Sequence, residues 1–587
     1  MKDYPQNAIR NVALLGHGGA GKTTLADAIL YYGKATDRIG KIGDSTTVMD
    51  FDAEEKKRKT SVSTSVYSLE LGASKLNLID APGLFDFAGG VCEALAAADS
   101  AIITISGKSG LTVGAKQAFD KARALKKSIA FFVGKLDSSH AHFYRVLSAL
   151  AGQYGAIICP VVVPYIENEQ VKCYINLIEN KAYACNGVEI KEMRLPVSGE
   201  VDNMRSMLLE AIATADEDLM EKYFAGEEFT TEEMLHGLAI GVKSGDICPV
   251  YSGVQQNGDA VPMMVENLLQ ILPAVSDCKY IDAQGEEKAF DANGDAALCV
   301  FKTIADPFVG KLSYFKVLSG AIKNDIRLTN NRTGNEERLS KIMWLKASKQ
   351  EDATTITAGD IGAVAKLGNV LTGDTLSLKG DLAIAPIAFP RPNLSVAVYP
   401  KAKGDEEKIA GAFNRMAEED PTIAVYNDKE TKEFILSALG EQHIDVIVSR
   451  LKAKFGAEAD LKKPKIAYRE TIRKTVQIQG RHKKQSGGHG QFGDVWIRFE
   501  PCDSQELVFC EEVFGGAVPK NFFPAVEKGL KDSCQKGVLA GYPMVGLKAT
   551  LYDGSYHPVD SSEMSFKMAA SIAYKAGIPQ ANPVLLE

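Results

Sequence analysis

The feature that most restricts the fold of this chain is a glycine-rich loop between an apolar run and a helical stretch. The loop follows residues 11–15 directly and has the pattern GxxxxGK[ST]. Glycines at such a turn let backbone N–H groups surround phosphate oxygens, the lysine adds a positive charge, and the threonine hydroxyl can reach Mg²⁺. The residues of this phosphate loop, with the threonine that follows it, are Gly16, His17, Gly18, Gly19, Ala20, Gly21, Lys22, Thr23 and Thr24. The pattern predicts a nucleoside-triphosphate site.

The first 150 residues alternate short apolar runs with amphipathic stretches. Runs of this length are typical of buried strands, and the stretches between them have the period of helices. The expected strands are 11–15, 76–79, 101–105 and 129–133, and the expected helices are 23–33, 90–97, 113–125 and 138–154. This alternation predicts a doubly wound, mainly parallel sheet with helices on both faces.

Two further short motifs follow strands of this expected sheet. Asp80 and Gly83 come after residues 76–79, where a carboxylate can hold Mg²⁺ through water and a glycine N–H can reach a terminal phosphate. Lys135 and Asp137 come after residues 129–133, and a carboxylate there can accept hydrogen bonds from the N1 and N2 edge of guanine. The three elements in this order are typical of a GTPase, and we expect GTP or GDP and Mg²⁺ as its cofactors.

The rest of the chain changes character several times. A hairpin region and an acidic helical stretch at 201–224 precede short β-rich runs at 285–385, which predict a small barrel. Strands and helices alternate again after 390, as in α+β units. We therefore expect a multidomain α/β and β fold, with a P-loop GTPase domain that carries an insertion, a β-barrel domain and two α+β domains. The expected boundaries are 1–276 (insertion at about 155–243), 277–387, 388–464 and 465–587.

Composition excludes several classes of protein. The 587 residues are 45% hydrophobic and 24% charged, which suits a chain with several cores, and the net charge of −8 argues against a protein that is basic throughout. The start shows no secretory signal and no apolar run approaches 18 residues, so we expect a cytoplasmic protein without a membrane span. The ten cysteines include no Cys-x-x-Cys pair, which predicts free thiols rather than a disulfide scaffold or metal cluster.

The chain resembles bacterial elongation factor G, a translational GTPase, along essentially its whole length. Matching stretches outside the GTP site are AGDIG at 358–362, GEQH at 440–443, AYRETI at 467–472, KQSGG at 484–488, LAGYP at 539–543, GSYH at 554–557 and VDSSE at 559–563. The resemblance implies that residues 388–464 form a ferredoxin-like domain III and that residues 465–587 form a domain IV that reaches the ribosome. It also implies a final ferredoxin-like domain, which we expect to be absent from this chain.

Several positions depart from the family pattern and indicate a divergent paralogue. The family's catalytic histidine, which positions the attacking water, corresponds to Leu84, so no catalytic residue is assigned. The asparagine of its guanine motif corresponds to Gly134, and a phosphate-loop aspartate corresponds to Gly19. The resemblance implies Ser61 as the Mg²⁺-binding hydroxyl of the first switch region, beside Thr23 and Asp80. The fifth guanine element is expected near Ser252 and Gly253.

A basic segment suggests contact with RNA. Residues 462–485 carry nine lysines and arginines against one acid, Glu470. A polar, glycine-rich loop follows, and such a loop can approach an RNA backbone closely. The resemblance implies that this loop and residues 554–560 form a tip that reaches the decoding region of the small ribosomal subunit. The expected contact residues are Lys484, Ser486, Gly487, His489 and His557.

The leading hypothesis is an elongation factor G-like GTPase that acts on the ribosome as a monomer, with translocation as its role. The alternative is a GTP-dependent ribosome-binding regulator, protection factor or recycling factor with weak or no intrinsic hydrolysis, which Leu84 motivates. A P-loop enzyme acting on a small metabolite would leave the barrel and the tip unexplained.

Overall fold

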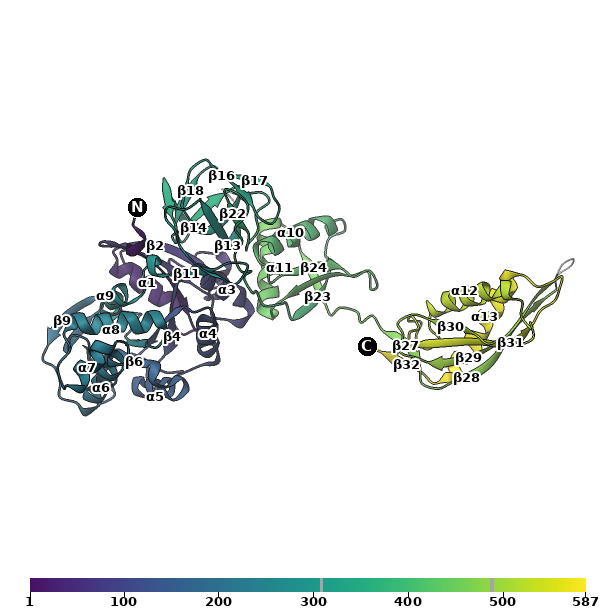
Figure 1. Cartoon of the computed structure of the whole chain (residues 1–587), viewed down its shortest axis with the longest axis horizontal. Helices are drawn as coiled ribbons and strands as arrows, with labels where there is room; N and C mark the ends of the chain where they lie inside the picture. The colour runs from purple at the N-terminus through teal and green to yellow at the C-terminus, as the bar shows by residue number, and fades with distance from the viewer. Residues whose placement is uncertain (307–309, 486–489) are drawn as a thin grey trace. The chain divides into compact units, whose positions relative to one another are not determined.

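The computed structural model describes residues 1–306, 310–485 and 490–587. The chain forms two compact units, the first made of residues 1–426 and 435–462 and the second of residues 427–434 and 463–587. Figure 1 traces the chain from purple at the N-terminus to yellow at the C-terminus and labels many of its helices and strands. Within the described residues, no helix is both long enough and apolar enough to cross a membrane.

The first unit begins with a sheet in which an interior strand, β1, leads into the phosphate loop. Strands pair in the order β2-β3-β1-β4-β5-β10-β6-β7-β8-β9, and all contacts from β3 to β6 in this order are parallel. The strands are β1 (Ile9–Leu15), β2 (Ser65–Leu71), β3 (Ser74–Asp80), β4 (Ser100–Ser106), β5 (Ser128–Gly134), β6 (Ile158–Glu167), β7 (Gln170–Asn176), β8 (Lys181–Asn186), β9 (Glu189–Met193) and β10 (Cys248–Ser252). The predicted mainly parallel sheet is confirmed.

Nine helices are described in this domain. They are α1 (Lys22–Tyr32), α2 (Ala53–Arg58), α3 (Ala88–Ala97), α4 (Val113–Ala124), α5 (Phe143–Tyr154), α6 (Gly199–Ala213), α7 (Glu217–Phe224), α8 (Thr231–Ser244) and α9 (Val261–Ile271). Two of the predicted helical stretches differ from the structure. Helix α5 begins at Phe143 rather than at 138, because the preceding loop contains His140 with φ of 65°. The stretch 201–224 is two helices, because the Asp216 side chain accepts backbone N–H groups and caps α7.

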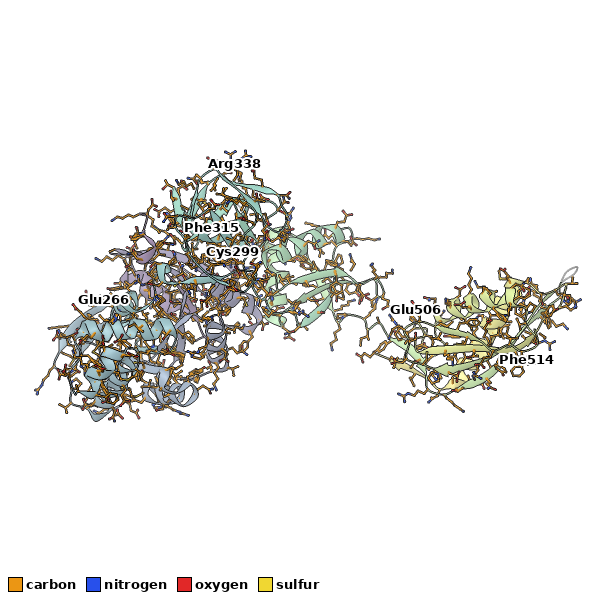
Figure 2. The ribbon with its side chains drawn as sticks, in the orientation of Figure 1. Glu266, Cys299, Phe315, Arg338, Glu506 and Phe514 are labelled. Atoms are coloured by element: carbon orange, nitrogen blue, oxygen red, sulfur yellow. The ribbon has the colours of Figure 1, made fainter. Side chains whose placement is uncertain are left out.

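A domain of antiparallel strand pairs follows, and a second apolar core lies among its strands. The short strands β11 (Lys279–Ile281) and β12 (Glu287–Ala289) precede β13 (Ala297–Asp306), β14 (Gly310–Ser319), β15 (Ala321–Lys323), β16 (Ile326–Asn330), β17 (Glu336–Leu339), β18 (Ile342–Lys346), β19 (Lys349–Asp352), β20 (Thr355–Thr357), β21 (Ile361–Ala365) and β22 (Thr375–Ser377). Cys299 and Phe315 lie in this core, whereas Arg338 on β17 is exposed (Figure 2). The alternation of buried and exposed residues along β17 is that of a strand with one face on a core.

The last domain of the first unit has four strands and two helices. The strands pair in the order β24-β25-β23-β26. Its elements are β23 (Leu394–Pro400), α10 (Glu406–Glu419), β24 (Ala424–Asn427), β25 (Phe434–Ala438), α11 (Glu441–Phe455) and β26 (Ala459–Lys462). The apolar face of α10, with Ile409 and Phe413, is buried.

The second unit is an α+β domain. Its main sheet has the order β28-β29-β31-β30, and α13 packs against β28, β29 and α12. Its elements are β27 (Arg469–Ile472), β28 (Val476–Lys484), β29 (Gln491–Pro501), β30 (Val508–Glu511), α12 (Phe523–Cys534), β31 (Leu547–Ser555), α13 (Glu563–Gly577) and β32 (Pro583–Leu586), which pairs with β27.

Candidate functional site

The phosphate loop lies where parallel strands end side by side. Leu14 on β1 is opposite Asp80 on β3, so the loop after β1 and the motif after β3 are neighbours. Gly16 and Gly21 have φ of 134° and 100°, a range that favours glycine. A Cβ on Gly16 would lie 2.4 Å from the Thr104 carbonyl oxygen, so strand β4 also requires glycine there.

Lys22 is held inside this loop. Its buried ammonium group donates to the carbonyl oxygens of Gly16 (3.1 Å) and His17 (3.0 Å). Burial lowers its pKa, against the attraction of Asp80 and Asp50. A Cβ on Gly83 would lie 2.2 Å from Lys22 Nζ. The two predicted phosphate-binding residues, Lys22 and Gly83, are therefore in direct contact.

The three predicted Mg²⁺ residues gather at the start of α1. The hydroxyl oxygens of Thr23 and Ser61 are 3.0 Å apart. Both carboxylate oxygens of Asp80 are buried and lack a hydrogen bond of good geometry within the described parts of the chain, although the Thr23 hydroxyl lies near enough to lower the Asp80 pKa. Burial, with the nearby charge of Asp50, raises the pKa of Asp80 to about 7. Hydroxyl and carboxylate oxygens are hard ligands suited to Mg²⁺, and a cation would satisfy the buried carboxylate, so these residues fit the expected ion.

Two buried acids, which the sequence analysis did not single out, hold the segment that carries Ser61. Asp27 on α1 accepts the N–H of Val48 at 3.1 Å, and Glu55 on α2 accepts the N–H groups of Asp52 (3.1 Å) and Val62 (3.1 Å). Burial raises the pKa of Asp27 to about 7 and that of Glu55 to about 8. Asp52 and Glu55 form a capping box, whose spacing is visible in the sequence.

Leu84 packs on the phosphate loop. A Cβ on Gly18 would lie 2.8 Å from Leu84 Cδ2. Leu84 also packs in an apolar cluster with Val62, Phe87 and Val446. Its side chain has no group that can orient water, so the described contacts are those of a packing residue.

His17 is the histidine of the loop itself. Its ring lies edge-on to Phe85, with 5.7 Å between centroids, and its Nδ1 is buried without a hydrogen-bond partner among the described residues. A Cβ on Gly114 would lie 2.6 Å from this Nδ1, so α4 approaches the ring closely.

The expected guanine motif borders the phosphate loop. Lys135 Nζ donates to the Gly19 carbonyl oxygen at 2.7 Å, and Asp137 is exposed. The Ser252 hydroxyl is buried and donates to the Val162 carbonyl oxygen at 2.8 Å, so its side chain is used within the sheet.

The loop that follows Ser252 also reaches this motif. The Gly253 N–H donates to the Val133 carbonyl oxygen at 3.2 Å, which places this loop beside Gly134. Gln255, which the sequence analysis missed, accepts the N–H of Lys135 through Oε1 at 2.9 Å.

In the second unit, the end of the β28–β29 hairpin meets the loop that carries His557. Asp560 Oδ1 accepts the N–H of Gly490 at 3.0 Å, which connects this loop to the start of β29. Lys484 is the last residue of β28, the other strand of the hairpin. His557 is about half exposed, and its Nδ1 accepts backbone N–H groups of Val559 (3.3 Å) and Asp560 (3.1 Å). The predicted contact residues Ser486, Gly487 and His489 lie outside the described residues.

Comparison with known protein families covers most of the chain. The model of the elongation factor Tu GTP binding domain matches residues 7–274, and that of elongation factor G domain 2 matches residues 295–379. Elongation factor G domain III matches residues 389–463, and elongation factor G domain IV matches residues 464–582.

Among solved structures, a crystal structure of a protein from Thermus thermophilus is similar to this chain. The two sequences are 35% identical, the TM-score is 0.84, and the match covers 99% of this chain and 86% of that chain. This similarity extends through all the domains described above.

Proposed function

Because this chain belongs to the elongation factor G family, whose GTP-binding and ribosome-directed domains it shares in order, we propose that it binds GTP and Mg²⁺ and acts on the ribosome in translocation. The observation that carries this proposal is the convergence of Lys22, Gly83 and the Thr23–Ser61 pair on one phosphate loop.

Each of these residues has a distinct part in holding the nucleotide. The loop N–H groups and the Lys22 ammonium bind phosphate oxygens, since the loop glycines leave the backbone open on that side. Thr23, Ser61 and Asp80 would hold Mg²⁺, which would supply positive charge to phosphate oxygens of the nucleotide. Ser61, in the first switch region, and Gly83, in the loop after β3, would both contact the terminal phosphate, so loss of that phosphate would release the segments that carry them.

Recognition of the guanine base and recognition of the ribosome involve different residues. Asp137 is exposed beside the loop and accepts the N1 and N2 hydrogen bonds of guanine. In the second unit, Lys484, His557 and the loop containing Ser486, Gly487 and His489 contact ribosomal RNA. Because Nδ1 of His557 faces backbone N–H groups of its own loop, Nε2 is the ring nitrogen left to donate to an RNA phosphate.

The proposal is tested by measuring GTP hydrolysis by this chain with and without ribosomes, together with GDP binding by calorimetry. We expect binding that requires Lys22 and hydrolysis that ribosomes stimulate. Lys22→Ala is the control for the site, and His557→Ala is the control for the tip. Binding without any ribosome stimulation would overturn the translocation role and leave a nucleotide-binding protein.

The alternative is a ribosome-binding regulator that protects or recycles ribosomes with little hydrolysis. Leu84 favours it, because a leucine packed between Gly18 and Val62 supplies no group for orienting water. A protein of this kind would co-sediment with ribosomes in the presence of GTP and remain bound, whereas a translocation factor would dissociate after hydrolysis.

A further inference from the structure

At the end of strand β5, the space that a side chain of residue 134 would take is occupied by a side chain from another loop. Gly134 is buried and carries no side chain, and its φ lies outside the left-handed range, so an ordinary residue would suit this backbone. The obstacle is the carboxamide of Gln255: a Cβ on Gly134 would lie 2.2 Å from Gln255 Oε1 and 2.8 Å from its Nε2. The space beside the Gly134 Cα is therefore occupied by an amide from the loop after β10.

This amide connects two parts of the nucleotide site. Gln255 Oε1 accepts the N–H of Lys135 at 2.9 Å, and its Nε2 donates to the Ala20 carbonyl oxygen at 3.3 Å. A Cβ on Gly21 would lie 2.1 Å from the same Nε2, so the amide lies directly against the phosphate loop. Gln255 is 2% exposed, and loss of its side chain would leave a buried N–H and a buried carbonyl without these partners.

Lys135 makes a second connection between the expected guanine motif and the phosphate loop. It has a positive φ of 58°, and its Nζ donates to the Gly19 carbonyl oxygen at 2.7 Å. Its backbone is thus held by Gln255 while its side chain is held by the phosphate loop. The two connections fix the conformation of residues 135–137, from which Asp137 is presented.

We infer that Gln255 is a positioning residue for guanine binding, and that it supplies from a different loop the carboxamide that the family's guanine motif carries at the position of Gly134. The inference rests on the proposed GTP binding. Gln255 acts through the backbone of Lys135 and Ala20 rather than by touching the base, so its loss should lower both the affinity for guanine nucleotides and the discrimination against adenine nucleotides.

The test moves the carboxamide from residue 255 to residue 134. We expect Gln255→Ala to weaken GDP binding about tenfold or more and to reduce the preference for GDP over ADP. Gly134→Asn alone should also weaken binding, because the new side chain meets Gln255. The double variant Gly134→Asn/Gln255→Ala should recover most of both the affinity and the preference, since it restores one carboxamide at this point. Gln270→Ala, on the exposed side of α9, is the matched control.

Calorimetry with GDP and ADP and a thermal melt of each variant separate the outcomes. Gln255→Ala with unchanged GDP affinity and preference would overturn the inference, even if the melting temperature falls. If Gln255→Ala does not fold, Gly134→Asn and the double variant decide: binding by the double variant no better than by Gly134→Asn would overturn it. A wild-type chain that binds no guanine nucleotide would overturn the proposed function and this inference together.

Discussion

Leu84 separates the two proposed roles at the scale of a single residue. If a missing water-orienting group limits hydrolysis, Leu84→His should raise ribosome-stimulated turnover about 100-fold or more, the lower end of what a positioned acid or base contributes. The measurement is single-turnover GTP hydrolysis with saturating ribosomes. Leu84→Met keeps the apolar contacts with Val62 and Phe87 and should leave the rate unchanged. Equal rates for Leu84→His and wild type would show that another step is limiting.

Glu55 makes stability depend on pH. Burial raises its pKa to about 8, well above the ordinary value for a glutamate. Between about pH 4.5 and 8 the folded state therefore holds more protons than the unfolded state, and stability falls as the pH rises through this window. We expect the melting temperature of the nucleotide-free chain to fall between pH 6.5 and 8.5, and Glu55→Gln to reduce this fall by about 2 °C or more.

Glu227→Gln is the control for this experiment, because Glu227 is exposed. A melting temperature that falls equally in Glu55→Gln and wild type would assign the dependence to other groups, among them Asp27, whose pKa is also raised to about 7 by burial.

At the scale of elements, helix α2 is attached to helix α11. Arg450 Nη2 donates to Asp52 Oδ2 at 2.9 Å, and the Ser449 hydroxyl donates to Glu54 Oε1 at 2.6 Å. Burial alone would raise the pKa of Asp52, but the Arg450 charge helps to hold it below its usual range. Because α2 leads directly to Ser61, α11 and the Mg²⁺ residues are connected through one short segment.

Removing the Arg450–Asp52 hydrogen bond should make residues 53–62 more mobile. We expect Arg450→Met to raise hydrogen exchange at residues 53–62 about tenfold, since a hydrogen bond between charged groups contributes about 1.5–3 kcal/mol. Arg415→Met, at an exposed position on α10, should leave exchange there unchanged. Unchanged exchange in Arg450→Met would mean that Glu55 and Asp27 alone hold the segment.

The elements of the nucleotide site also show what the sequence can predict. Strand positions and the phosphate loop follow from apolar runs and a local motif, and both were predicted within a few residues. The role of Gln255 was not, because it depends on strand β10 lying beside β5, a contact between residues far apart in sequence. The only signal in the sequence was Gly134 itself, which marks the loss of the family's asparagine but does not say which residue occupies the space.

At the scale of the first unit, the nucleotide-binding domain and the β domain share buried polar contacts and one apolar core. Lys75 Nζ donates to both carboxylate oxygens of Asp360, at 2.8 and 2.7 Å, and lies 3.4 Å from the centroid of the Trp344 ring. Asn77 Nδ2 also donates to Asp360 at 2.8 Å. The apolar core of the nucleotide-binding domain continues through residues of β13, β14 and β18. The two domains should therefore unfold together.

This coupling predicts a large effect from one buried charge. Lys75→Met leaves Asp360 buried without its cation, and we expect it to lower the free energy of unfolding by about 3–5 kcal/mol. The double variant Lys75→Met/Asp360→Asn removes both charges and should lose less than the sum of the two single variants. Urea denaturation measures these values. Lys379→Met breaks an exposed pair with Asp295 and should change the free energy of unfolding little. A Lys75→Met loss as small as that of Lys379→Met would show that the apolar core alone joins the two domains.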